Sequence, residues 1–398
     1  MWGELAPVGR DRASGGYRRH AWTGADADCR AWFRGQAEAR GLRYEVDRNG
    51  NQWAWLGDAD AGDAVVTGSH LDSVPDGGAF DGPLGVVSSF AALDELRRRG
   101  ARFTRPLAIA NFGDEEGARF GLACVGSRLA AGQLSKAQAH ALVDADGVTL
   151  PQAMERAGHD PDAIGPDPER LARIGAFVEL HIEQGRALDR TEHPVGIASA
   201  IWPHGRWRFD FAGEANHAGT TRLVDRRDPM LTYAATVLAA RRAAEDAGAV
   251  ATFGKVAVEP NGVNAIPSLV RGWLDSRAVD QDTLDAVVTA VQAAARERAG
   301  SDGVGLTVVR ESFTPVVDFP HALREEIDRI LGGSVPVLGT GAGHDAGILS
   351  AAVPTAMLFV RNPTGVSHSP AEHAAEDDCA AGVRALADVL EGLACRSH

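Results

Sequence analysis

The chain has 398 residues, is 44% hydrophobic and 24% charged, and carries a formal net charge of −14. This length exceeds one ordinary hydrophobic core and predicts roughly two or three domains. The negative charge argues against nucleic acid or an anionic membrane as partner. No apolar run approaches the roughly 18 to 20 residues of a membrane helix, and no signal-peptide pattern is found near residue 1. A cytoplasmic location is therefore expected. The four cysteines form no CxxC pair, and we expect them to be reduced.

The first part of the chain alternates apolar runs with helical patterns. Residues 63–70, 106–113 and 175–183 predict three short buried strands, and residues 84–99 predict an amphipathic helix after the first of them. A second helix is expected near residues 121–131. Strands that alternate with helices indicate βαβ units and a mostly parallel sheet, and therefore an α/β fold.

The pattern changes between residues 205 and 317. Two helices, at 228–247 and 282–299, alternate there with four strands, which predicts a small ferredoxin-like α+β domain. The α/β pattern then returns and continues to the end of the chain. We therefore expect a discontinuous catalytic domain, 1–204 and 318–398, interrupted by an inserted domain, 205–317.

Polar side chains stand at the carboxyl ends of the three predicted strands. The first strand ends at His70 and continues into a glycine-rich acidic loop that contains Asp81, the second is followed by Glu115 and Glu116, and the third contains His181. Ligands of parallel sheets bind at this edge. Two imidazoles with carboxylates suit Zn²⁺, Mn²⁺ or Co²⁺ better than Ca²⁺. The sequence therefore predicts one metal site at the edge of the sheet.

The glycine-rich loop admits three interpretations: an acidic turn, a phosphate cradle or part of a metal site. A phosphate cradle requires a different glycine motif and basic residues, whereas this loop is acidic. A single H-x-D triplet or Glu pair is usually a surface feature, so the metal interpretation depends on their joint occurrence. Glu115 and Glu116 are adjacent, and one of them could act as a general base while the other binds metal. Asp72 would orient the imidazole of His70.

Seven segments carry a more specific signal, and they are "GSHLDSVPDGGAFDGPLGV", "FGDEEGARFG", "ELHIEQG", "ANHAGTT", "PNGVNAIPSLVRGWLDSRAVD", "GTGAGHDAG" and "GVSHSPAE". In this order they resemble the M20-type dinuclear metallohydrolases, and more narrowly the branch of N-carbamoyl-L-amino-acid hydrolases, β-ureidopropionases and allantoate amidohydrolases. The resemblance implies a metallopeptidase-like catalytic domain with an inserted lid and dimerisation domain. It also implies two divalent metal ions per subunit and a homodimer formed through the inserted domain.

The resemblance assigns the metal ligands residue by residue. Asp81 would bridge the two ions, with His70 and His181 holding one of them. Glu116 and His368 would hold the other ion.

The same resemblance assigns the reacting and binding groups. Glu115 would be the general base, and His217 would donate a hydrogen bond to the developing oxyanion. Gln184, Asn264 and Arg277 would contact the substrate. An arginine can grip a carboxylate through two parallel hydrogen bonds, and Arg277 would supply the local positive charge that this acidic chain needs for an anionic substrate.

The expected reaction is hydrolysis of the ureido C–N bond of N-carbamoyl-L-amino acids to the amino acid, ammonia and carbon dioxide. Allantoate amidohydrolase, β-ureidopropionase, and a peptidase or aminoacylase are alternatives, the last disfavoured by His181 and Arg277. A non-catalytic protein that binds ureides or metal is an alternative of another class, disfavoured by Glu115. His344 and Asp345 are expected to support the site from outside the ligand set.

Overall fold

The computed structural model describes residues 1–395. These residues form two compact units, one made of Met1–Ser199 with the chain from Asp318 onward, and the other of Ala200–Val317. The second unit begins at Ala200, whereas the sequence pattern placed its start at residue 205. No helix among the described residues is long and apolar enough to cross a bilayer.

The first unit is built on a mixed sheet with the order β1-β2-β4-β3-β5-β15-β6-β13, and β14 also pairs with β6. Its four central strands run parallel, while β1, β2 and β6 pair antiparallel. The α/β class with a parallel sheet centre is thereby confirmed. The strands are β1 (Arg43–Val46), β2 (Gln52–Leu56), β3 (Ala64–His70), β4 (Leu107–Phe112), β5 (Ile174–Ile182), β6 (Val195–Ile201), β13 (Val317–Asp318), β14 (Val337–Thr340) and β15 (Thr355–Val360).

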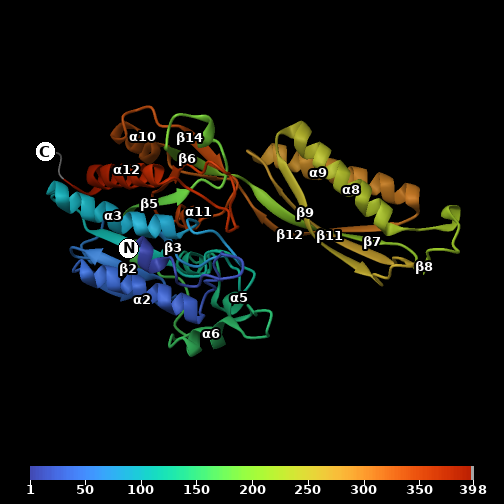
Figure 1. Ribbon diagram of the computed structural model, residues 1–398, viewed down its shortest axis with the longest axis horizontal. Coiled ribbons are helices and arrows are strands. Elements are labelled where there is room, and N and C mark those ends of the chain that lie inside the picture. Colours follow the sequence, from blue (N-terminus) through green and yellow to red (C-terminus); the bar gives the residue numbers. More distant parts are fainter. Residues whose placement is uncertain (396–398) are drawn as a thin grey trace. The chain divides into compact units, whose positions relative to one another are not determined.

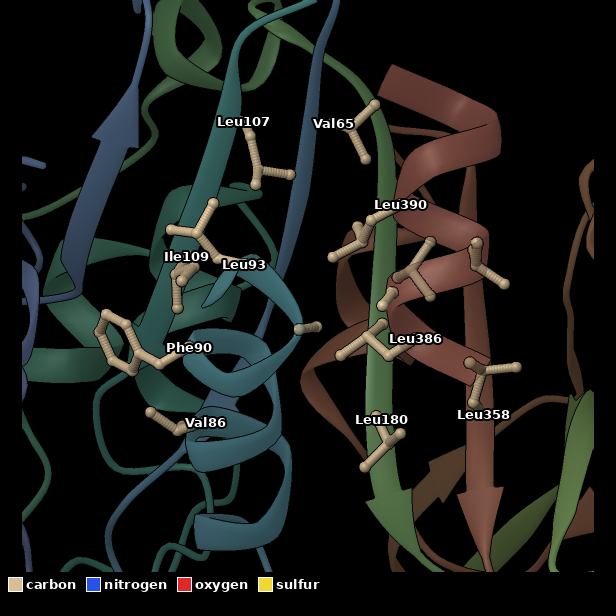
Figure 2. Close-up of a cluster of buried hydrophobic side chains, with 14 of the residues drawn as sticks. Val65, Val86, Phe90, Leu93, Leu107, Ile109, Leu180, Leu358, Leu386 and Leu390 are labelled. Carbon is tan, nitrogen blue, oxygen red and sulfur yellow. The ribbon is translucent and has the colours of Figure 1, made fainter. Parts of the chain in front are cut away.

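The long helices of this unit, α2, α3 and α12, pack on the sheet because each carries one apolar face. Figure 2 shows Val86 and Phe90 of α3 and Leu386 and Leu390 of α12 among the strand residues they cover, and all four side chains are fully buried. The helices are α1 (Trp2–Leu5), α2 (Gly24–Ala39), α3 (Pro83–Arg99), α4 (Val125–Ala130), α5 (Lys136–His140), α6 (Leu150–Arg156), α7 (Pro168–Leu171), the 3₁₀ turn η1 (Leu188–Arg190), α10 (His321–Ile330), α11 (Asp345–Leu349) and α12 (Glu376–Ala394).

The helix expected near residues 121–131 is shorter than predicted. It begins only at Val125, because Gly121 and Cys124 both have positive φ angles, 77° and 58°, which an α-helix does not tolerate. The preceding loop therefore remains irregular, and it includes the Glu115 and Glu116 segment.

The second unit is a four-stranded antiparallel sheet of order β12-β7-β11-β9 with α8 and α9 packed together on one face (Figure 1). This order and the helix positions match the ferredoxin-like pattern. Trp207, Phe209 and Phe211 alternate along β7 and form its core with the helices. The elements are β7 (His204–Ala212), β8 (Asn216–His217), η2 (Leu223–Asp225), α8 (Pro229–Ala247), β9 (Val250–Glu259), β10 (Ala265–Ile266), β11 (Leu269–Arg277), α9 (Gln281–Asp302) and β12 (Gly305–Thr314).

Candidate metal centre

The glycine-rich loop after β3 brings Asp81 back beside His70, the last residue of that strand. Gly82 follows with a φ of 80°, and a Cβ atom there would lie 2.4 Å from Cε1 of the His70 ring. Only glycine accommodates both this backbone conformation and this close approach. The glycine therefore seats the imidazole against the end of α3, next to the Asp81 carboxylate.

Two buried imidazoles face the same carboxylate oxygen. His181 Nε2 lies 3.2 Å from Asp81 Oδ1, and His70 Nε2 lies 3.6 Å from it. Both histidine side chains are almost fully buried, at 0% and 1% exposure. His70, Asp81 and His181 thus form one group whose ligand atoms lie within 4.8 Å of one another.

The other oxygen of Asp81 faces a second group. His368 Nε2 lies 3.4 Å from Asp81 Oδ2 and 3.4 Å from Glu116 Oε2, and the three residues again meet within 4.8 Å. Asp81 therefore presents one oxygen to each group, which is the arrangement of a carboxylate that bridges two cations. The structure brings together all five residues predicted to be metal ligands.

The protonation of the two buried histidines suits a cation. His70 Nδ1 lies 3.2 Å from the Asp72 carbonyl oxygen, and His181 Nδ1 lies 2.9 Å from the Ile182 carbonyl oxygen. Because a carbonyl oxygen only accepts, each Nδ1 carries a proton, and in the neutral ring that binds a metal Nε2 then offers its lone pair. Both Nε2 atoms are buried and have no hydrogen-bond partner among residues 1–395. Imidazole and carboxylate donors of this kind fit a divalent metal such as Zn²⁺, Mn²⁺ or Co²⁺.

The carboxylates of the centre have strongly perturbed pKa values. Burial tends to raise the pKa of Asp81, but the facing imidazoles of His181, His368 and His70 outweigh it and hold the pKa well below its usual range. Burial raises the pKa of Glu116 to about 7, and the nearby Asp81 charge adds to the rise. A bound cation would neutralise the negative charge of these buried carboxylates.

Glu115 lies beside the centre without belonging to either ligand group. Its Oε2 is 3.6 Å from His70 Nε2, and its side chain is 7% exposed. The Cys124 thiol lies 3.5 Å from the other oxygen and donates to it. A buried carboxylate next to the ligands but free of them has the position required of a general base.

Asp72 connects the base to the ligands. Its Oδ1 accepts the backbone N–H of Glu115 at 3.2 Å and its Oδ2 that of Glu116 at 3.0 Å, while Oδ1 lies 3.3 Å from His70 Nδ1. The side chain therefore orients both glutamates as well as the imidazole. The sequence predicted only its role toward His70.

Replacing Asp72 by alanine is expected to lower the free energy of unfolding of the metal-free protein by about 2 to 4 kcal/mol, because one buried and one partly buried N–H group lose their acceptor. Denaturant unfolding measures this change. Asp72→Asn keeps one acceptor oxygen and should lose less. Equal stability of the alanine variant and the wild type would show that water replaces the carboxylate.

His344, Asp345 and Glu179 lie behind His181. The His344 ring meets the His181 ring edge-on at 4.5 Å between centroids, and burial lowers the pKa of His344 well below its usual value. Asp345 accepts a hydrogen bond from Ser127. Glu179 was missed, although it stands two residues before His181 and so on the same face of β5. It accepts the hydroxyl of Ser69 at 2.7 Å.

Gln184 contacts Asp81 in the structure. Its Nε2 donates to Asp81 Oδ2 at 2.7 Å and to Ser367 Oγ at 3.1 Å. It was predicted to contact substrate, and its Oε1 is buried without a partner among the described residues. The amide is therefore adjacent to the Asp81 carboxylate, and its acceptor atom makes no hydrogen bond within the described part of the chain.

His217 and Asn264 lie close together in the second unit, His217 on β8 and Asn264 directly before β10. His217 pairs with Ala265, and the Asn264 carbonyl accepts the backbone N–H of Ala218 at 2.9 Å. His217 Nδ1 accepts the N–H groups of Gly219 and Thr220, so the exposed ring carries its proton on Nε2 and can donate it.

Arg277 is separated from this pair. It ends β11, whose first residue is Leu269, and eight residues of strand at about 3.3 Å each span roughly 26 Å. Its guanidinium donates to both oxygens of Asp275, with Nε at 2.8 Å and Nη2 at 3.1 Å. The structure does not bring Arg277 to His217 and Asn264 within one chain, although the sequence predicted that all three act on the substrate.

Comparison with known proteins identifies the family of the chain. A family model described as peptidase family M20/M25/M40 matches residues 66–392. The chain belongs to this family. It is similar to the N-carbamoyl-L-amino acid amidohydrolase of Geobacillus stearothermophilus, with 37% identity over 98% of this chain and 96% of that protein. It is also similar to the allantoate amidohydrolase of Bacillus subtilis, with 32% identity over 96% of this chain and 94% of that protein.

Among solved structures, an amidase of the hydantoinase/carbamoylase family from Burkholderia multivorans superimposes with a TM-score of 0.87 and 29% identity, covering 100% of this chain and 97% of that one. The predicted branch of the M20 family is thereby confirmed. This M20-family chain is an amidohydrolase that acts on non-peptide C–N bonds.

Proposed function

We propose that this M20-family chain hydrolyses the carbamoyl C–N bond of N-carbamoyl-L-amino acids and releases the amino acid, ammonia and carbon dioxide. The observation that carries the proposal is the arrangement of Asp81. One of its oxygens faces His70 and His181, the other faces His368, and Glu115 lies beside them outside both groups.

Each residue of the centre has a task in this reaction. Two divalent ions, held by His70, Asp81, Glu116, His181 and His368, would polarise the carbamoyl oxygen and increase the acidity of water. Glu115 accepts a proton from the attacking water and delivers it to the leaving nitrogen. The Nε2 proton of His217 stabilises the oxyanion that develops on the carbamoyl group.

Arg277 is proposed to bind the α-carboxylate of the substrate. The Nε and Nη2 groups of its guanidinium already donate to a carboxylate, that of Asp275. This supports the assignment, because the same two donors fit the carboxylate of a substrate. We expect Arg277→Gln to raise KM for N-carbamoyl amino acids by about 10- to 100-fold, the effect of losing a hydrogen bond to a charged group. Arg206→Gln is the matched control, since Arg206 also pairs with Asp275, at 3.3 Å. An equal effect of both changes would contradict the assignment.

An ammonia-release assay tests the substrate. The panel holds N-carbamoyl-α-amino acids, N-carbamoyl-β-alanine, allantoate, ureidoglycolate, N-acetyl amino acids and dipeptides, with Zn²⁺-, Mn²⁺- and Co²⁺-loaded protein. The highest kcat/KM is expected for an N-carbamoyl-L-amino acid. Allantoate is the second candidate, because an allantoate amidohydrolase is among the similar proteins. Turnover of N-acetyl substrates or dipeptides alone would refute the proposal.

We also propose a homodimer formed through the second unit. On α8, Leu231 and Leu238 are 55% and 62% exposed and lie seven residues apart on one helix face. Beside them β9 is an edge strand with an unpaired side. His217, whose partner strand β10 precedes the start of β11, and Arg277, at the end of β11, could then serve one small substrate from two copies. A solution mass near that of a single chain would contradict this assembly.

A further inference from the structure

A glutamate far along the chain is bonded to the segment that carries Asp81. Glu372 lies in the loop before α12, and its side chain is among the buried charged groups at 5% exposure. Its Oε2 accepts the backbone N–H of Phe80 at 2.8 Å and that of Asp81 at 3.0 Å. One carboxylate oxygen thus holds two consecutive peptide groups of the glycine-rich loop.

The loop is shaped to receive this carboxylate. A Cβ atom at Gly78 would lie 2.2 Å from Glu372 Oε2 and 2.5 Å from its Cδ. Such distances are far inside van der Waals contact, so any side chain at residue 78 displaces the glutamate. Gly78 therefore leaves the space that Glu372 fills.

The segment around Glu372 also holds the side chain of Asp81. Ser367 donates its hydroxyl to Asp81 Oδ2 at 3.1 Å, and His368 faces the same oxygen. Asp81 is consequently fixed at its backbone by Glu372 and at its carboxylate by Ser367. Its two oxygens point to different histidine groups only while the backbone keeps this orientation.

We propose that Glu372 is a positioning residue, whose carboxylate orients Asp81 for two divalent cations through hydrogen bonds to the backbone of Phe80 and Asp81. The inference rests on the proposed function, in which Asp81 bridges the cations, and adds a residue that contacts neither cation nor substrate. Partners of this kind outside the ligand set hold the ligands in the geometry that the metal requires.

The test is the Zn²⁺ affinity of the full chain, measured by competition with a chromogenic chelator. Glu372→Ala is expected to weaken Zn²⁺ binding by about 10- to 100-fold. Glu372→Gln should stay close to the wild type, because a glutamine carbonyl oxygen still accepts both N–H groups. Equal loss in the two variants would overturn the hydrogen-bonding role, and wild-type affinity in Glu372→Ala would overturn the inference as a whole. Absence of Zn²⁺ binding by the wild type would instead refute the proposed function.

A control and a double variant separate positioning from general stability. Asp167→Ala removes another buried carboxylate of the same unit, which accepts the backbone N–H of Arg170 at 3.3 Å, and should leave Zn²⁺ affinity unchanged. Gly78→Ala should weaken Zn²⁺ binding by itself, since it displaces Glu372. Combined with Glu372→Gly, which also removes the Cβ atom that lies 2.6 Å from the added methyl group, it should add little further loss to that of Glu372→Gly alone. Full additivity of the two losses would show that Gly78 and Glu372 act independently and would count against the inference.

Discussion

Glu115→Gln is expected to reduce kcat by about 100- to 10,000-fold, the usual contribution of a general base, while the protein keeps the metal content of the wild type. Glutamine has the same shape and can accept the Cys124 hydrogen bond, but it cannot take a proton from water. Because Glu115 belongs to neither ligand group, its loss removes no donor from the cations. Ammonia release and elemental analysis on the same samples measure both quantities.

The neighbouring residue provides the matched comparison. Glu116→Gln makes the same chemical change one residue along the chain, at a carboxylate that lies 3.4 Å from His368 Nε2. It should lower metal content as well as turnover. If Glu115→Gln also lost metal, Glu115 would be a ligand and the base would have to be sought elsewhere. If the Glu115→Gln variant kept full turnover, a catalytic role for Glu115 would be excluded.

Asp81→Asn is expected to lose both activity and metal. The carboxylate is 6% exposed and its oxygens face both groups of ligands, so the amide would replace an anionic oxygen in one group by an NH₂ donor. Removing a residue that hydrogen-bonds to a metal ligand weakens metal binding by about 10- to 100-fold. Removing a ligand that bridges both cations should weaken metal binding by more than that. Elemental analysis and the chelator competition measure it.

Asp76→Asn is the control for this prediction. Asp76 stands on the same loop, its side chain is 37% exposed, and it pairs with Arg18 at 3.0 Å. Its φ of 56° is also tolerated by asparagine, so the backbone should not change. Metal content should remain that of the wild type. A variant at Asp81 that retains both ions would show that the two histidine groups do not share a carboxylate.

The sequence accounted well for the regular elements and for the kind of site. The spacing of apolar residues and the lengths of the apolar runs placed β3, β4, β5 and α3 within one or two residues of their observed bounds. The N-terminal pair β1 and β2 escaped notice, although Trp53 and Trp55 are buried on β2. The two residues before Trp53, Asn51 and Gln52, are polar, and both are buried and hydrogen-bonded, which a hydrophobic pattern does not register.

Side-chain chemistry and strand order predicted a metal site, because histidines and carboxylates that follow parallel strands meet at one edge of the sheet. The assignment of each ligand came from the resemblance to the M20 family. The branch of the M20 family followed from short motifs in a fixed order. These properties are local, since each depends on residue type within a few positions along the chain.

Only the tertiary structure decided which oxygen of Asp81 faces which histidine, that Asp72 holds both glutamates, and that Glu372 holds the loop. It also separated Arg277 from His217 along β11. Each of these depends on the register of segments tens to hundreds of residues apart, 291 in the case of Asp81 and Glu372. Such pairings arise from the packing of whole elements against one another, and no local pattern of residues encodes them.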